Sequence, residues 1–368
     1  MNDMKLRLLE WLVCPVCSKS FSHTPLLCNG DETTEGLLSC DCGRSYPIVD
    51  GIPRVVEDAF GLFPAFGEKY ANLLPNARPR NVDSHPPGEE LRRTRESFGY
   101  QWTAFSAMVI DFRENFLEYI HPVQPAFFPG KRGLDVGCGF GRHIVNAAQF
   151  GAEMVGVDIS AAIDVTHKNT YNLPNVHLVQ ADVYRMPFRQ GTFDFAYSIG
   201  VLHHLPDPEA GFKQLVSVVK SEGAVFIWVY SKKRRLVNAM LENARALTTR
   251  LSPRFQMALS WAAAAVDWGG FVVPYRIMSQ LPGLGSVVRR FGTPRLKVYG
   301  NYPFQVAWAD WFDRLAAPIR FYYNENDLNG WLRRSDLSRT LVSPTGLFGW
   351  RAYGERDGQT TTSTRSQT

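Results

Sequence analysis

The sequence of 368 residues lacks the features that would export it or anchor it across a membrane. Its first residues, MNDMKLRLLEWL, contain no basic region leading into a long apolar run with a small-residue cleavage site, so we expect no secretion. No uninterrupted apolar stretch reaches membrane-spanning length. The nearest candidate, Met257 to Tyr275, is broken by Asp267 and a Gly-Gly pair. These absences predict a cytoplasmic protein.

A glycine-rich turn, RGLDVGCGFG at residues 132–141, lacks the third glycine of the dinucleotide fingerprint. A short apolar run, typical of a strand, leads into Gly137 and Gly139, where the backbone must bend sharply. The fingerprint G-x-G-x-x-G would end at position 142, which is Arg142. Asp135 suits a ligand that carries an ammonium or hydroxyls, and it would repel a pyrophosphate. The turn therefore favours a nucleotide-like cofactor other than NAD.

Acidic residues recur at the ends of the next two predicted strands. EMVGVDI ends near Asp158 and VHLVQAD ends at Asp182, while FDFAYSIG leads to Gly200 and AVFIWVY ends at Tyr230. Open α/β sheets bind ligands at the carboxyl edge that these residues share. Each acid taken alone could instead cap the next helix. The regular spacing of the series favours a cofactor site.

DVGCGFG, with these following strands, resembles motif I and the core of class I S-adenosylmethionine (SAM)-dependent methyltransferases. The resemblance implies a Rossmann-like, seven-stranded α/β core. It also implies that Asp135 and Gly137 face the methionine part of SAM, that Asp158 faces the ribose, and that Asp182 with Val183 faces the adenine. The complete expected cofactor set is Asp135, Gly137, Cys138, Gly139, Gly141, Asp158, Ile159, Asp182, Val183, Ser198 and Gly200.

Cysteine is scarce beyond residue 42, and five of the six cysteines lie at positions 14, 17, 28, 40 and 42. A disulfide scaffold would need an export signal, whereas closely spaced pairs favour metal. Cys14, Cys17, Cys40 and Cys42 would give zinc four sulfur ligands, which is typical of a structural site. Only one residue separates the second pair, so Cys28 is an alternative to Cys40. Buried free thiols are the remaining alternative.

The residues around both pairs resemble the small zinc ribbon of the Trm112 family. LLEWLVCPVC and LLSCDCGRSYPIVDGIP carry the resemblance, including its YPIxDGIP ending. In proteins similar to this one, such a domain stabilises the methyltransferase or docks partners. A protein partner bound through the ribbon is therefore one expectation.

The histidine pair His203-His204 and Tyr100 are the candidate catalytic residues. VLHHLPDP follows the fourth predicted strand, near the expected position of the transferred methyl group, and histidine has a pKa suited to a general base. In the family that this segment resembles, the pair often shapes the loop instead. FGYQW resembles a segment that folds over the cofactor in many bacterial methyltransferases, with Tyr100 and Gln101 as its polar tips, although simple aromatic packing would give the same pattern.

Positive charge is concentrated in residues 231–320. This segment contains fourteen Lys and Arg against four Asp and Glu, a net charge of +10, so the rest of a chain of net charge +5 carries −5. Four tryptophans and the apolar run MALSWAAAAV lie in the same segment. We interpret it as a substrate lid for an anionic or amphipathic acceptor, or one carried at an anionic membrane surface. A helical cap with solvated arginines is the alternative.

These observations predict a SAM-dependent methyltransferase that contains structural zinc. It would methylate an oxygen atom of a small-molecule acceptor or of one linked to a lipid or glycan. Peripheral contact with the inner face of a membrane is expected. The alternatives are an RNA base methyltransferase, which the apolar lid disfavours, and a non-catalytic SAM-binding partner protein. The expected organisation is a ribbon (1–57), a linker with helices over the cofactor (58–120), the core (121–230), the lid (231–320), the last helix and closing strands (321–357) and a disordered tail (358–368).

Overall fold

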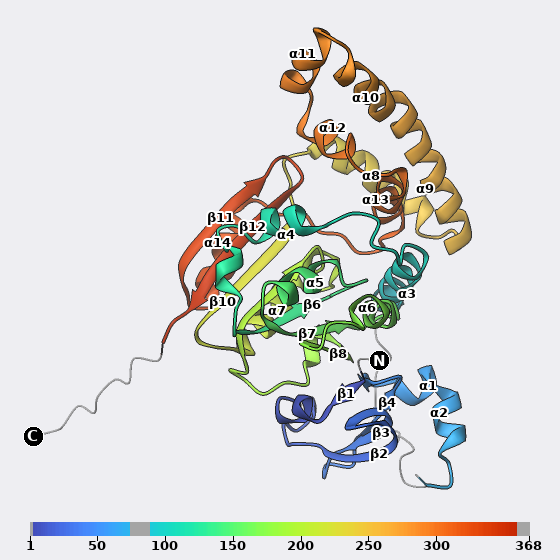
Figure 1. The fold of residues 1–368 in the computed structure, drawn as a ribbon, viewed down its shortest axis with the longest axis vertical. Coiled ribbons are helices and arrows are strands. Elements are labelled where there is room, and N and C mark those ends of the chain that lie inside the picture. Colours follow the sequence, from blue (N-terminus) through green and yellow to red (C-terminus); the bar gives the residue numbers. More distant parts are fainter. Residues whose placement is uncertain (1–2, 74–88, 359–368) are drawn as a thin grey trace, which may run out of the picture.

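The computed structural model describes residues 3–73 and 89–358 (Figure 1). Most of the Pro-rich part of the predicted linker, residues 74–88, and nearly all of the predicted tail, residues 359–368, lie outside the described residues.

Seven strands form the central sheet, in the order β8-β7-β6-β9-β10-β12-β11. All neighbours pair in parallel except β12, which runs antiparallel to both β10 and β11. The predicted seven-stranded core and its closing antiparallel pair are confirmed. The strands are β6 (Arg132–Val136), β7 (Glu153–Asp158), β8 (Val176–Ala181), β9 (Phe193–Ile199), β10 (Val219–Tyr230), β11 (Leu337–Thr345) and β12 (Gly349–Arg356).

Helices cover both faces of this sheet because its strands are apolar on both sides. On β9, Phe195 and Tyr197 pack with helices α4 and α5 on one face, whereas Ala196 joins the core formed with α7 and α14 on the other. The parallel strands are linked through helices, as such a sheet requires. The flanking helices are α3 (Glu89–Ala104), α4 (Arg113–Ile120), α5 (Arg142–Gln149), α6 (Ala162–Thr170), α7 (Pro208–Ser217) and α14 (Glu325–Arg334).

The N-terminal unit continues the same sheet beyond β8. Its last strand pairs in parallel with β8, matching Arg54 with Gln180 and Val55 with Ala181. The unit lies next to the core at the bottom of Figure 1. Its elements are β1 (Met4–Lys5), β2 (Ser22–Asn29), β3 (Glu32–Ser39), β4 (Ser45–Val49) and β5 (Ile52–Val55), followed by the short helices α1 (Ala59–Leu62) and α2 (Pro64–Lys69).

Arg54 joins the N-terminal unit to the core. Its side chain is fully buried and donates to Gln180 Oε1 at 3.2 Å and to Asp164 Oδ1 at 2.6 Å, both in the core, as well as to the Val49 carbonyl at 3.1 Å. The Val13 amide donates to the Pro187 carbonyl at 2.9 Å. A buried guanidinium needs hydrogen-bond acceptors, and two of those that Arg54 finds lie in the core. These hydrogen bonds therefore hold the two units in one relative position.

A helical segment between β10 and α14 extends away from the sheet and forms the upper part of Figure 1. It contains α8 (Arg235–Thr248), α9 (Pro253–Asp267), α10 (Val273–Gln280), α11 (Leu284–Phe291), α12 (Pro294–Tyr299) and α13 (Phe304–Ala316). We call residues 235–299, α8 to α12, the helical arm. A π-helical turn, Trp268–Val272, joins α9 to α10 without a break.

One helical run among the described residues passes a length and composition test for crossing a membrane. It is Pro253–Gln280, 28 residues long, with a mean hydropathy of 1.2 in its best window and only 22% of that window buried. Asp267 and Arg276 lie within it.

The ribbon–core junction predicts a large effect for Arg54→Met. The substitution leaves Gln180 Oε1 and the Val49 carbonyl without their donor, so we expect the free energy of unfolding to fall by about 2 kcal/mol. Arg7→Met is the matched control, because Arg7 is 57% exposed and its ion pair with Glu153 crosses the same junction. It should cost less than about 1 kcal/mol. Urea unfolding measures both, and equal effects would contradict the role given to Arg54.

Candidate cofactor site and zinc cluster

The glycine turn is fixed to the end of β7. The amides of Gly137 and Cys138 both donate to the Val157 carbonyl, at 2.7 and 3.0 Å. Gly137 has φ +79°, and a Cβ there would lie 2.3 Å from Val201 Cγ2; Gly139 has φ +57°, and a Cβ there would lie 3.3 Å from Trp102 Nε1. Both positions therefore require glycine, because the turn is bound to β7 and packs closely against Val201 and Trp102.

Asp135 is buried within the sheet, and its Oδ2 atom has no hydrogen-bond partner among the described residues. Burial, helped by repulsion from Asp158, raises the pKa of the Asp135 carboxyl to about 8, against the opposing effects of Tyr197 and Arg142. An unpartnered buried carboxyl is costly unless a donor or cation meets it. It suits the ammonium group that the resemblance assigns to this position.

Asp158 and Asp182 lie at the carboxyl ends of β7 and β8. Asp158 Oδ2 accepts from the Gly139 amide at 3.0 Å, and its Oδ1 accepts from Ser160; Asp182 Oδ1 accepts from the Tyr184 amide at 3.0 Å. Burial raises the pKa of each carboxyl, and these donors oppose the rise. Both acids thus cap the following turn. A carboxylate has about four acceptor positions, so Asp158, which accepts from the Gly139 amide and from both the amide and the hydroxyl of Ser160, keeps about one for ribose, whereas Asp182 keeps about three for adenine.

The remaining predicted cofactor residues lie around the same edge. Ser198 is buried and donates to the Val136 carbonyl at 2.9 Å, so its hydroxyl joins β9 to β6. Cys138 is buried beside Thr166, and burial raises the pKa of its thiol well above the usual value. The other members follow strand ends or begin helices: Gly141, Ile159, Val183 and Gly200.

Helix α3 covers the glycine turn through Trp102, which stacks on Phe140 with ring centroids 4.9 Å apart. Gln101 is buried and donates to the Ala309 carbonyl of α13 at 3.2 Å. Tyr100 is half-buried, with its ring against Phe312 of α13. Among these α3 residues, sequence reasoning missed Trp102, although its place in FGYQW was a usable signal.

His203 and His204 are both buried between the core and α13. His204 Nδ1 lies 2.7 Å from the Ile319 carbonyl, so this nitrogen carries the proton, and burial lowers the pKa of His204 to about 4. Neither ring nitrogen of His203 has a hydrogen-bond partner among the described residues. Burial also lowers the pKa of His203 well below its usual value. Both rings are therefore neutral at pH 7, and Phe98 of α3 lies against His204, with ring centroids 4.8 Å apart.

A buried polar network ties α13 to this histidine pair. Asp313 Oδ2 accepts from the Tyr230 hydroxyl at 2.5 Å and from Arg320 at 2.8 Å, and its Oδ1 lies 3.7 Å from His204 Nε2. Burial raises the pKa of Asp313, but the Arg320 charge and these donors more than offset it and hold that pKa below the usual value. Sequence reasoning missed Tyr230 and Arg320 as the partners of Asp313.

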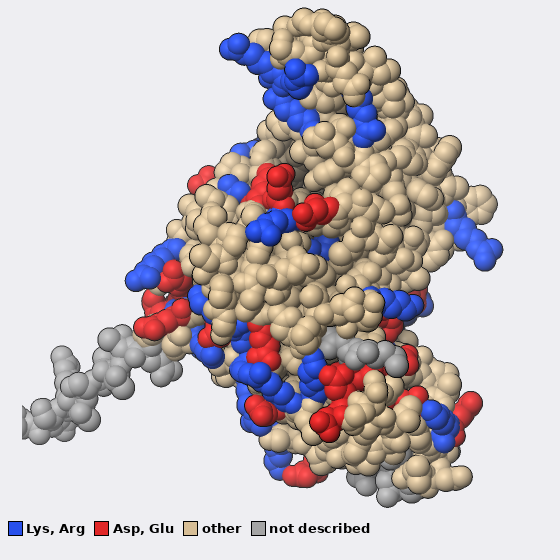
Figure 2. Space-filling model, in the orientation of Figure 1, with Lys and Arg blue, Asp and Glu red and all other residues tan. Residues whose placement is uncertain are grey.

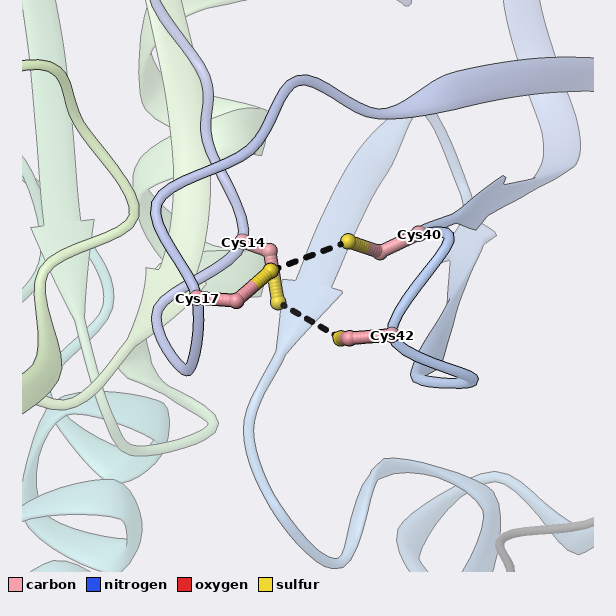
Figure 3. A group of neighbouring side chains, drawn as sticks. All are labelled: Cys14, Cys17, Cys40 and Cys42. Atoms are coloured by element: carbon pink, nitrogen blue, oxygen red, sulfur yellow. Dashed lines mark hydrogen bonds between the residues drawn. The ribbon is translucent and has the colours of Figure 1, made fainter.

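Four cysteines of the N-terminal unit point toward one another (Figure 3). Their sulfur atoms all lie within 4.8 Å of one another, with Cys17 3.3 Å from Cys40 and Cys14 3.7 Å from Cys42. Cys28 lies apart on β2, exposed, so the structure places Cys40 in the cluster and leaves Cys28 outside it. Four sulfurs in this arrangement could hold a zinc ion in a closed tetrahedral site.

Two segments of the chain match known families. Residues 134–227 match the model described as a methyltransferase domain, and residues 5–51 match the one described as Trm112p-like protein. Sterol 24-C-methyltransferase of Schizosaccharomyces pombe is 33% identical over 140 residues, covering 36% of this chain and 35% of the relative. A ubiquinone biosynthesis O-methyltransferase of Albidiferax ferrireducens is 33% identical over 114 residues, covering 30% and 44%.

Among solved structures, phosphoethanolamine N-methyltransferase 2 of Haemonchus contortus, in complex with phosphomonomethylethanolamine and S-adenosylhomocysteine, superposes with a TM-score of 0.42. It is 14% identical, and the match covers 73% of this chain and 59% of that one. The two curated relatives named above match this chain over less than half of their own length.

The sheet order, the glycine turn with its acids and the match of residues 134–227 define a SAM-dependent methyltransferase domain within this chain. Residues 5–51 form an N-terminal Trm112p-like domain. The family predicted from the motifs is thus confirmed.

The cysteine cluster predicts how zinc content responds to substitution. The protein should retain about one zinc ion per chain. Cys14→Ser with Cys17→Ser removes two of four ligands and should abolish zinc binding, whereas Cys28→Ser, outside the cluster, should leave it unchanged. Elemental analysis of the purified proteins measures the content. Full zinc in the double variant, or loss in the control, would refute the four-cysteine site.

The raised pKa of Asp135 predicts a pH-dependent affinity for SAM. Only the ionised carboxylate attracts a cation, and with a pKa of about 8 its ionised fraction grows as the pH rises. Affinity should therefore increase from about pH 6 to about pH 8 by up to about tenfold per unit, then level off. Titration calorimetry measures it, and Asp135→Asn corrects for titration of the ligand itself. The same slope in both proteins would exclude Asp135 as its source.

Proposed function

We propose that this protein transfers the methyl group of SAM to a small-molecule or lipid-linked acceptor, on an oxygen atom. The buried Asp135 carboxyl beside the glycine turn, whose Oδ2 atom has no hydrogen-bond partner among the described residues, is the observation that carries the SAM assignment, because an unsatisfied carboxylate oxygen there suits a cationic ligand group. The sterol and ubiquinone enzymes among the relatives support an acceptor with lipid character.

SAM supplies a methyl carbon that is already activated by its positively charged sulfur. The protein's main task is then to align donor and acceptor and, for a hydroxyl acceptor, to receive a proton. Asp135 would hold the ammonium, Asp158 the ribose hydroxyls and Asp182 the adenine. The resemblance to the family implies these roles for the three carboxyls, which lie at the carboxyl edge of the sheet.

Within this proposal the two histidines have different roles. Burial lowers the pKa of His204 to about 4, although the hydrogen bond from its Nδ1 proton to the Ile319 carbonyl opposes this change. His204 is therefore a weak base, which suits it to positioning. His203 lies directly beside it, and both of its nitrogens are free of partners among the described residues. A neutral imidazole offers one donor and one acceptor, so His203 could bind an acceptor hydroxyl. Tyr100, whose ring lies against Phe312 of α13, would help to close the site.

The proposal extends to the location of the enzyme. We infer a cytoplasmic catalytic domain that meets its acceptor at the inner face of a membrane, since the arm is apolar and basic. An RNA acceptor would need cations along a polar groove, and RNA affinity would fall steeply with salt. The cations of this arm instead accompany exposed leucine, valine and phenylalanine side chains.

The experiment follows a labelled methyl group from SAM into a mixture of cell lipids and RNA. Label should appear in the organic-solvent fraction, and Asp158→Asn should lower incorporation by at least about tenfold because it removes a charged acceptor for the ribose. Asp336→Asn, an exposed site after α14, is the control and should match the unmodified protein. Label in the RNA fraction would replace the proposed acceptor, and SAM binding without any transfer would favour a non-catalytic partner.

A further inference from the structure

The helical arm exposes its apolar side chains to solvent. Along the continuous run from α9 to α10, Phe255, Leu259, Val266, Val273 and Ile277 follow the i, i+4, i+11 spacing of one face, allowing for the π-helical turn. Phe255 is 69% exposed and Val266 74%. From Phe255 to Ile277 the stripe is about 33 Å long at the rise of an α-helix, and monomeric proteins rarely expose so extended an apolar face.

Three polar residues of the same run, Gln256, Ser260 and Asp267, are buried, which reverses the usual pattern of a surface helix. Ser260 is buried and accepts from Trp308 Nε1 at 3.1 Å. Asp267 is buried, pairs with Arg295 and accepts from Trp311 Nε1 at 3.0 Å. The inner face therefore satisfies its polar groups against α12 and α13. The apolar stripe is left without a partner among the described residues.

Helix α11 has an apolar face of its own, where Leu284, Val287 and Phe291 lie at i, i+3, i+7 and are all exposed. Cations gather beside it at the free end of the arm, around α11 and α12, whereas most of the arm in Figure 2 carries no charge. Arg289 and Lys297 are exposed and form no ion pair among the described residues. This charge is therefore available to an anionic partner.

A pocket of about 620 Å³ lies at this free end. Arg276, Arg289 and Lys297 line it together with Ser279 and Asn301, and no carboxylate lines it. The three cations donate only to backbone carbonyls, Arg289 to Ser279 and Lys297 to Arg290 among them. Three positive charges without a counter-charge suit phosphate oxygens.

The positions at which the arm joins the core limit how it could bind to a bilayer. It leaves the core through α8 and returns through α13, so both of its ends lie on the same side. If Pro253–Gln280 crossed the bilayer, the residues after it would have to cross back before the chain reaches α13. Helix α12, which lies on that return path, has only six residues and is too short to span. An apolar face with cations beside it instead suits a helix lying in the headgroup region.

We propose that the apolar face of the helical arm lies in the surface of an anionic lipid membrane, with Arg276, Arg289 and Lys297 holding lipid phosphate groups at its free end. Charge complementarity selects this occupant, because a second copy of the arm would bring like charges together. The inference goes beyond the proposed methyl transfer and does not depend on it.

Vesicle flotation of the full chain tests this membrane contact. The unmodified protein should float with vesicles of phosphatidylcholine mixed with phosphatidylglycerol, and less well with phosphatidylcholine alone or at high salt. Replacing Leu259, Val266 and Ile277 by Gln should weaken binding to both vesicles by at least about tenfold. Leu347→Gln is the matched control, because Leu347 is also exposed but lies between β11 and β12. It should change nothing.

The pocket has its own variant, Arg289→Gln with Lys297→Gln. Loss of two charges should weaken binding to the mixed vesicles on the order of 30-fold and leave binding to phosphatidylcholine unchanged. Phosphatidylcholine carries its phosphate beside a compensating choline charge, so an equal loss on both vesicles would overturn the selection of anionic lipid by these cations. Unmodified protein that stays with the unbound fraction would overturn the membrane contact. A stable dimer in sedimentation that the Gln substitutions on the stripe dissociate would also overturn the membrane contact. In that case a second copy of the chain, and not a membrane, would cover the stripe.

Discussion

The parallel pairing of β6 with β7 on one side and β9 on the other is the constraint on which the site depends. It matches Asp135 with Gly156 and with Tyr197, so the three strands end at one edge. The backbone conformation of the glycine turn is then fixed, because the amides of Gly137 and Cys138 donate to the Val157 carbonyl on the neighbouring strand. The buried carboxyl of Asp135 follows from the same pairing, since the strand that carries it is covered on both faces.

The Trm112p-like domain extends this sheet within a single chain. Its last strand adds to β8, the strand that Asp182 directly follows, and Arg54 reaches from it to Gln180 and Asp164. A zinc ion held at the cysteine cluster would therefore stabilise a domain whose edge supports one side of the cofactor site. In this chain the core itself occupies that edge of the ribbon. The structure thus gives one partner for the domain, its own methyltransferase core, without any second chain.

The sequence predicted what depends on local spacing, and it could not predict contacts between distant segments. Strand ends, the glycine turn and the cysteine pairs have short-range signals, so the seven-stranded core and the clustering of Cys40 with Cys14 and Cys17 could be anticipated. Arg54 gave no such signal, because its two acceptors in the core, Gln180 and Asp164, lie 126 and 110 residues away. The inward direction of Asp267 was equally hidden, since periodicity identifies a polar face but not the side on which it is buried.

Helix α13 connects the two parts of the proposed activity. On one side it packs against α9, and Trp308 and Trp311 bind the inward polar groups of the arm. On the other, Asp313 accepts from Tyr230 and lies beside His204 at the end of the core sheet. An arm held at a membrane would thus be joined through one packed helix to the residues proposed to meet the acceptor. Because packed helices move as units rather than deform continuously, the arm and the histidine pair would shift together.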